Sequence, residues 1–230
     1  DILDDFIGRV RLFGLHFASL DIRQDSRVHQ KVIDTIVQHY TNHSTKDLSN
    51  EERIELLTNP TFTVQAEDFE EDIVVDTIKN VYQLKEIQRQ NGELGVHRYI
   101  ISNSESIYDV LNVYALFRFC GYQHEEIKFD IMPLFETIRG LEEAENTMNT
   151  LYNIPIYAAH LNRRKHYQSI MLGFSDGTKD GGYIKANWEI YRTKEILTSI
   201  SDQNNIKVIF FDGRGGPPAR GGGKTHERTA

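Results

Sequence analysis

The fold is decided between residues 96 and 134, which read VHRYIISNSESIYDVLNVYALFRFCGYQHEEIKFDIMPL. Residues 96–101 form a short apolar run rich in β-branched side chains, which is typical of a buried strand. Residues 104–120 have the length of a helix, and a second short apolar run follows at 129–134. A strand, a helix and a strand in this order predict a parallel βαβ unit.

The same alternation continues on both sides of this unit. Toward the carboxyl end we expect helices near 141–151 and 157–162, a strand at 168–174, a helix at 183–200 and a strand at 206–211. Toward the amino end we expect a strand at 10–22 and a helix at about 26–40. The chain is therefore α/β, with five candidate strands in a mainly parallel sheet. An open doubly wound sheet and a (β/α) barrel both remain compatible with this pattern.

Residues 41–95 interrupt the alternation, and we interpret them as a helical insertion between strands. A short helix at 49–57 begins with the capping box Ser49-x-x-Glu52. A long amphipathic helix is expected at about 66–90, because apolar residues recur there every three or four positions. Asn91-Gly92 ends it.

Composition narrows the class of protein. The chain has 230 residues, 39% of them hydrophobic, and a net charge of -8, which disfavours binding to nucleic acid or to an anionic membrane surface. Its single cysteine, Cys120, lies in an apolar stretch and is expected to pack there, and a lone cysteine fits a reducing compartment. The nine histidines lack metal-ligand spacing, so no zinc site is predicted. The chain opens without methionine and ends after a glycine-rich run, so we expect a piece of a longer protein.

Chemically active residue types follow the predicted strands. In parallel sheets, functional sites form where strands end at their carboxyl edge. Carboxylates there can hold a hard divalent cation such as Mg²⁺, and arginine or lysine can hold phosphate and carboxylate groups. The predicted site comprises Arg23, Glu136, Asp176, Lys179 and Arg214.

Each of these residues also has a structural interpretation. Glu136 could cap the following helix, Asp176 could stabilise a turn, and Lys179 could be a solvated surface charge. Asp21 and Arg23 could form a surface pair of little energetic value. Their joint placement favours a site for a metal and a phosphate.

The segment 213–230 carries a net charge of +3 in an acidic chain, which indicates an anionic ligand. It follows a strand and contains Gly-Lys-Thr, so a P-loop that binds nucleotide phosphates is an alternative interpretation. The P-loop spacing would require glycine where Pro218 stands, and proline lacks the N–H that a phosphate cradle uses. We therefore favour a glycine-rich anion-binding loop.

Four motifs carry a family resemblance. They are Asp21-Ile-Arg-Gln-Asp-Ser, Pro133-Leu-Phe-Glu-Thr, Gly173-Phe-Ser-Asp-Gly-Thr-Lys-Asp-Gly-Gly and Asp212-Gly-Arg-Gly-Gly-Pro-Pro-Ala-Arg-Gly-Gly. Together, and in this order, they resemble phosphoenolpyruvate carboxylase. The resemblance extends from Arg11 to Gly222 and implies a partial, helix-rich TIM-type (β/α) barrel with about five of its eight strands.

The resemblance also implies a reaction and a set of roles. It implies a cytoplasmic, usually tetrameric lyase that forms oxaloacetate and phosphate from phosphoenolpyruvate and bicarbonate with Mg²⁺ or Mn²⁺. The metal would be held by Glu136 and Asp176, with Arg23, Lys179 and Arg214 near the substrates. Arg220 resembles a residue that contacts the inhibitor aspartate or malate.

The chain departs from the family pattern in two respects. Many members have histidine before Gly-Arg-Gly-Gly, and here it is Asp212, whose charge beside Arg214 is expected to alter phosphate contacts. The family's histidine motif, its later barrel strands and its C-terminal inhibitor-site residues are missing from these 230 residues. We therefore expect little or no carboxylase activity from the isolated chain.

Overall fold

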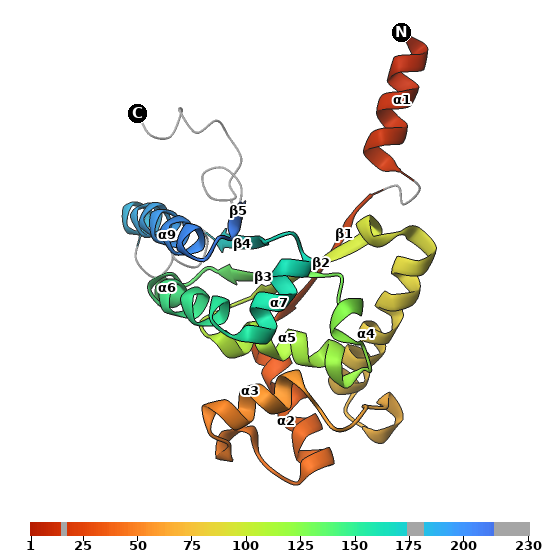
Figure 1. The fold of residues 1–230 in the computed structure, drawn as a ribbon, viewed down its shortest axis with the longest axis vertical. Coiled ribbons are helices and arrows are strands. Elements are labelled where there is room, and N and C mark those ends of the chain that lie inside the picture. Colours follow the sequence, from red (N-terminus) through yellow and green to blue (C-terminus); the bar gives the residue numbers. More distant parts are fainter. Residues whose placement is uncertain (15–17, 174–181, 214–230) are drawn as a thin grey trace.

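Five parallel strands form a sheet whose spatial order follows the sequence, β1-β2-β3-β4-β5 (Figure 1). The computed structural model describes residues 1–14, 18–173 and 182–213. The strands are β1 (Leu20–Asp25), β2 (Val96–Ser102), β3 (Asp130–Phe135), β4 (Tyr167–Gly173) and β5 (Lys207–Gly213). A doubly wound sheet would change direction at a switch point. The uninterrupted order therefore identifies part of a (β/α) barrel.

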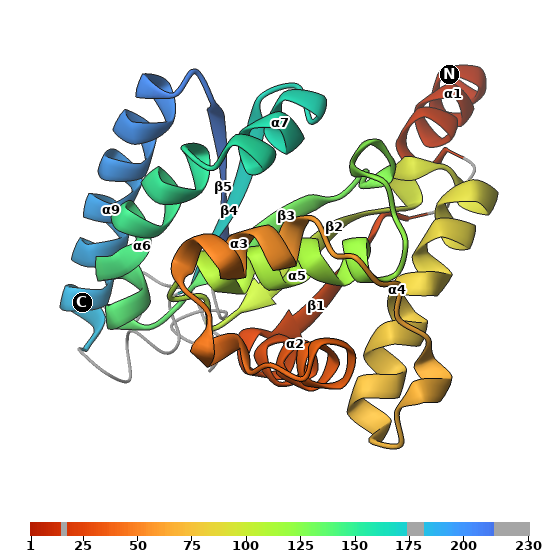
Figure 2. The ribbon, with the colours of Figure 1, turned by 60° about the horizontal axis from the view of Figure 1, so that its bottom comes forward.

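The helices that follow the strands cover one face of this sheet. They are α2 (Ser26–Thr41), α5 (Ile107–Phe119), α6 (Ile138–Tyr152), α7 (Pro155–Arg163) and α9 (Tyr183–Gln203). Each packs against a strand or a neighbouring helix on this outer face (Figure 2). The main core lies between sheet and helices, whereas a separate small cluster of Ile100, Met132, Leu134 and Met171 lines the inner face.

The first element is a helix, α1 (Ile2–Phe13), where we expected a strand at 10–22. Asp1 and Asp4 form a capping box, and Arg9 pairs with Asp5 one turn away, so local bonds support the helix. None of its residues is buried, and it stands apart from the rest of the chain (Figure 1). The strand itself begins at Leu20 and continues to Asp25.

Between α2 and β2 the chain forms two further helices, α3 (Asn50–Thr58) and α4 (Asp72–Asn91). The predicted capping box of Ser49 and Glu52 is present, and Gly92 follows α4 as expected. Short 3-10 turns precede and follow these helices at Thr45–Asp47, Ala66–Asp68 and Glu93–Gly95. The predicted long helix starts later than expected, at Asp72, because the backbone is extended at Phe69 and Glu71.

Two other helices differ from prediction only at their starts. α5 begins at Ile107, where Ser106 and Asp109 form a capping box that replaces the expected start at 104. α7 begins at Pro155, whose fixed φ and missing N–H suit the first turn of a helix. Among the helices that the structure describes, none is long and apolar enough to cross a membrane.

Candidate functional site

The carboxyl edge of the sheet brings Arg23 and Glu136 together from different strands. Arg23 lies near the end of β1, and Glu136 directly follows β3. The distance from Arg23 Nη2 to Glu136 Oε2 is 3.9 Å, so the two charges attract without a direct hydrogen bond. Glu136 is largely shielded, with 16% of its side chain exposed, whereas 52% of the Arg23 side chain is exposed. A carboxylate and a guanidinium therefore meet at the predicted rim.

A backbone N–H from the neighbouring strand end holds one oxygen of Glu136. Asn103, the first residue after β2, donates this N–H to Glu136 Oε1 over 2.9 Å. The backbone of Asn103 is left-handed, with φ of 57°. Asparagine tolerates this conformation better than most residues do.

Three hydrogen bonds anchor the chain around Asn103. Ser26 at the start of α2 is buried, and its hydroxyl donates to the Asn103 carbonyl over 2.7 Å. The next N–H, that of Ser104, donates to the carbonyl of Leu134 over 3.1 Å, and the Ser104 hydroxyl donates to Ile101 over 2.9 Å. Two of these bonds hold the peptide group between Asn103 and Ser104, directly after the N–H that Asn103 donates to Glu136.

Gly173, the last residue of β4, supports Glu136 from the other side. A Cβ atom placed on Gly173 would lie 2.5 Å from the Glu136 Cβ and 3.2 Å from its Cα. Side chains do not approach one another this closely, so only glycine leaves room for Glu136 in its present position. Glu136 is thus flanked by the backbone at the ends of β2 and β4, the two strands that neighbour β3.

Other polar groups near this edge have structural partners. Thr137 accepts a hydrogen bond from Gly140 and caps α6, so Glu136 is not the helix cap. Asp25 caps α2 and binds the Arg27 guanidinium through both of its oxygens. The hydrogen bond from Arg27 is the largest influence that lowers the pKa of the Asp25 carboxyl. Asp25 is therefore kept ionised as a structural group.

Asp21 belongs to a different pair from the one we considered. Its carboxylate lies 3.1 Å from Nε of Arg98 on β2, whereas Arg23 faces Glu136. The interpretation of Asp21 and Arg23 as a surface pair is therefore wrong. Because alternate residues of a strand share a face, Asp21 and Arg23 both project to the inner side of the sheet.

Four of the predicted site residues lie outside the described part of the chain. These residues are Asp176, Lys179, Arg214 and Arg220. Within the described residues, no group of three or more His, Cys, Asp or Glu side chains is placed to hold a metal ion. Among the described residues, Glu136 Oε2 accepts no hydrogen bond and lies 3.9 Å from the Arg23 guanidinium, so this carboxylate oxygen can serve as one ligand to a hard divalent cation.

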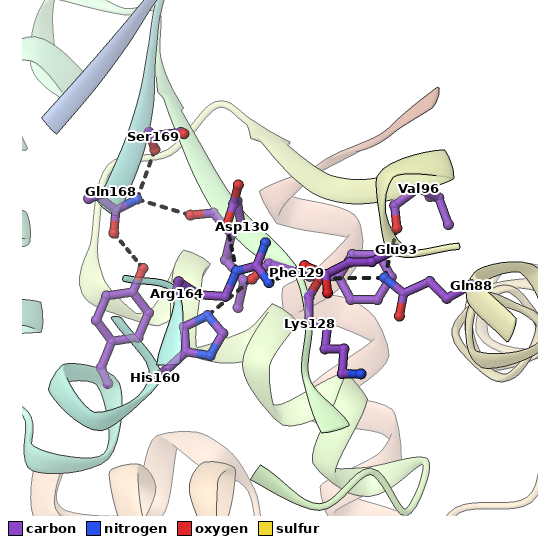
Figure 3. A network of polar contacts seen from close by, with 12 residues as sticks. Gln88, Glu93, Val96, Lys128, Phe129, Asp130, His160, Arg164, Gln168 and Ser169 are labelled. Carbon is purple, nitrogen blue, oxygen red and sulfur yellow. Dashed lines mark hydrogen bonds and ion pairs between the residues drawn. The ribbon is translucent and has the colours of Figure 1, made fainter. Parts of the chain in front are cut away.

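The opposite end of the strands carries a polar network of a different kind (Figure 3). Arg164 donates to Asp130 at the start of β3 over 2.7 Å and to Glu93 over 2.6 Å. The Gln168 amide donates to the Ile131 carbonyl, and its oxygen accepts from Tyr157. These groups pair with one another within the protein, which is typical of the stabilising end of a (β/α) barrel.

The two most buried histidines are structural as well. His29 and His160 are fully buried in α2 and α7. His160 Nε2 donates to the Phe129 carbonyl over 3.1 Å, and His29 contacts the Tyr99 hydroxyl. Cys120 is buried as predicted, and burial raises the pKa of its thiol to about 12, which excludes an activated nucleophile.

Comparison with known proteins agrees with this arrangement. The family model for phosphoenolpyruvate carboxylase matches residues 1–229. A phosphoenolpyruvate carboxylase of Nitrosomonas europaea is 33% identical over 226 residues, covering 94% of this chain and 24% of the relative. One from Nitrosomonas eutropha is 33% identical over 230 residues, covering 95% and 24%. The chain belongs to the phosphoenolpyruvate carboxylase family. It spans about a quarter of the length of these curated relatives.

Asp212, the departure from the carboxylase family pattern, has its own counter-charge. Its carboxylate lies 2.6 Å from Lys194 Nζ, and Lys194 projects from α9 on the outer face of the sheet. We expected Asp212 to add negative charge beside Arg214 and to alter phosphate contacts. Lys194 compensates that charge from the helix side, while Arg214 lies outside the described residues.

Two contributors to the Glu136 site had no assigned role in the sequence. Asn103 belongs to none of the four motifs that carry the family resemblance, and Gly173 is only the first residue of the third motif. The available signal was an asparagine between two serines directly after an apolar run, a pattern that favours a turn with a left-handed residue. Sequence spacing could not reveal that this turn points its N–H at a residue 33 positions later.

Proposed function

We propose that this chain is part of a phosphoenolpyruvate carboxylase that forms oxaloacetate and phosphate from phosphoenolpyruvate and bicarbonate. The observation that carries the proposal is the meeting of Glu136 and Arg23 at the carboxyl edge of a partial barrel that belongs to this family. The full-length protein would be a cytoplasmic lyase in anaplerotic carbon fixation, most simply a homotetramer. The family match includes most of the glycine-rich segment, which argues against the P-loop alternative.

The proposed roles follow the chemistry of the residues. Glu136 and Asp176 would hold Mg²⁺ or Mn²⁺, which as a Lewis acid stabilises negative charge on an enolate oxygen. Arg23, Lys179 and Arg214 would bind the phosphate and bicarbonate groups and neutralise the phosphoryl group during its transfer. Arg220 would contact aspartate or malate as an allosteric inhibitor.

The geometry of Arg23 suits a substrate-binding group. Its guanidinium is half exposed and is not consumed by a short hydrogen bond to Glu136. An exposed ion pair at this distance contributes little to stability, so Arg23 is available to an anionic ligand. Glu136, in contrast, is shielded and fixed, as a metal ligand requires.

The test is oxaloacetate formation in a coupled assay with the full-length protein. Glu136→Gln keeps the size of the side chain but removes its charge, so kcat/KM is expected to fall roughly 100-fold or more because metal stabilisation of the enolate is lost. Glu142→Gln, an exposed position on α6, is the matched control and should retain full activity. An unchanged rate for Glu136→Gln would contradict the proposal.

The same assay tests the isolated chain. We expect no oxaloacetate formation by these 230 residues above the level of their Glu136→Ala variant. The reason is that the chain spans about a quarter of the length of its relatives and supplies five strands of a barrel. Clear activity of the isolated chain would show that the proposed site is complete without the rest of the protein.

A further inference from the structure

We propose that the left-handed turn at Asn103 is a positioning device for Glu136, which leaves only Oε2 of this carboxylate to bind a divalent cation. The inference rests on the proposed function, because it assigns a coordination mode to the proposed metal ligand. It concerns the backbone of Asn103, a residue outside the motifs that carry the family resemblance.

The hydrogen bond to Asn103 occupies one oxygen of the carboxylate. The N–H of Asn103 lies 2.9 Å from Glu136 Oε1, within ordinary hydrogen-bond distance. A hydrogen bond to a charged acceptor is stronger than one between neutral groups. Oε1 is therefore the held atom. Oε2 faces Arg23 at 3.9 Å, too far for a hydrogen bond, and remains the atom that can contact a cation.

The surroundings prevent the carboxylate from turning. Ser26 and Leu134 both hold the peptide group between Asn103 and Ser104, through hydrogen bonds of 2.7 and 3.1 Å to its carbonyl and its N–H. Gly173 packs so closely that an added methyl group would lie 2.5 Å from the Glu136 Cβ. Backbone at the ends of β2 and β4 thus restricts Glu136 from two sides, and partners of this kind govern how strongly a ligand binds its metal.

The left-handed backbone provides a selective way to disturb the turn. Asn103→Gly keeps the N–H and the conformation, because glycine adopts positive φ freely. Asn103→Val disfavours positive φ and turns the N–H away from Oε1, because a β-branched residue is a steric outlier there. Asn42, with φ of 58° at the end of α2, supplies the matched control Asn42→Val, which carries the same backbone strain far from Glu136.

The experiment measures Mn²⁺ affinity and melting temperature for the full-length protein and these variants. Asn103→Val is expected to weaken Mn²⁺ binding by roughly 10-fold, the lower end of the effect of losing an outer partner of a metal ligand. Asn103→Gly should bind Mn²⁺ as tightly as the unmodified protein. Asn42→Val should lower the melting temperature without a change in Mn²⁺ affinity. If Asn103→Val does not fold, Ser26→Ala, which removes the bond to the Asn103 carbonyl, is expected to weaken Mn²⁺ binding several-fold.

Three outcomes distinguish the positioning role of Asn103 from the proposed function on which it rests. Equal Mn²⁺ affinity in Asn103→Val and the unmodified protein, with clear weakening in Glu136→Gln, would overturn the positioning role alone. The positioning role is likewise overturned if Asn103→Val does not fold and Ser26→Ala binds Mn²⁺ normally. Unchanged Mn²⁺ affinity in Glu136→Gln itself would overturn the metal role of Glu136 and, with it, the proposed function.

Discussion

Glu136 and Arg23 carry opposite charges at one edge of the sheet but lie in different environments. The carboxylate is shielded and held by a backbone N–H, whereas the guanidinium is half exposed and 3.9 Å away. A fixed acceptor suits a metal ion, and a solvated, movable cation suits an incoming anion. Both residues were predicted from their positions after strands. The backbone contacts of Glu136 with Asn103 and Gly173 were not predicted. They depend on the φ angle of Asn103 and on the close approach of Gly173, neither of which can be read from the sequence.

The buried histidines predict a dependence of stability on pH. Burial lowers the pKa of His29 from 6.5 to about 4 and that of His160 from 6.5 to about 3. Below pH 6.5 the unfolded chain binds protons that the folded chain does not. Above pH 6.5 both histidines are neutral in the folded and the unfolded chain, so they do not reduce the free energy of unfolding there. As the pH falls from 6.5 toward 4, each buried histidine lowers the free energy of unfolding by about 1.4 kcal/mol per pH unit.

Glutamine variants isolate this contribution. His160→Gln can keep a donor near the Phe129 carbonyl but cannot titrate, so the melting temperature of the full-length protein should fall less steeply below pH 6.5 than in the unmodified protein. His29→Gln should behave in the same way. His43→Gln, at an exposed position, is the control and should leave the slope unchanged. Parallel pH profiles for all four proteins would show that His29 and His160 do not titrate on unfolding.

At the scale of elements, the two ends of β3 have different polar surroundings. Its carboxyl end leads into Glu136, and its amino end begins with Asp130, which is tied to Arg164 (Figure 3). Arg164 lies in the turn before β4 and pairs with the carboxylates of Glu93 and Asp130. Only 14% of its side chain is exposed. This division matches the general separation of function and stability between the two ends of a (β/α) barrel.

Arg164→Ala is therefore expected to destabilise the fold without weakening the metal site. Removing the guanidinium leaves Asp130 and Glu93 without their partner, at a cost of about 2–3 kcal/mol because the pair is only partly shielded from water. Thermal melting should detect this loss, while Mn²⁺ affinity at low temperature stays normal. Arg89→Ala, which breaks a pair exposed on α4, should change neither quantity. A loss of Mn²⁺ affinity in folded Arg164→Ala would contradict the separation of the two ends.

The elements were predictable where the pattern was unambiguous. The strands β2 to β5 are apolar runs between helices, and the sequence located each within a few residues. The first strand was misplaced because β1 (Leu20–Asp25) is half polar, whereas the preceding segment is more apolar and yet helical. The apolar side chains of α1 are exposed, so burial, which the sequence pattern assumes, is absent there.

At the scale of the whole molecule, the strand order is what selects a barrel over a doubly wound sheet. Periodicity could predict parallel strands but not their spatial order, so both architectures remained open until the order β1-β2-β3-β4-β5 was known. The inner face keeps apolar side chains at the surface, including Ile209 and Phe211, each 49% exposed. Such side chains fill the interior of a closed barrel. In the full-length carboxylase that we propose, further strands would cover this face.

The most direct test of the account is the position of the divalent cation. We would determine a crystal structure of the full-length protein with Mn²⁺ and locate the ion by its anomalous scattering. We predict an ion about 2.1 Å from Glu136 Oε2, the bond length of a small divalent cation to a carboxylate oxygen, with Oε1 still bound to the N–H of Asn103. An ion bound elsewhere, with Glu136 paired only to Arg23 and Asn103, would contradict the account.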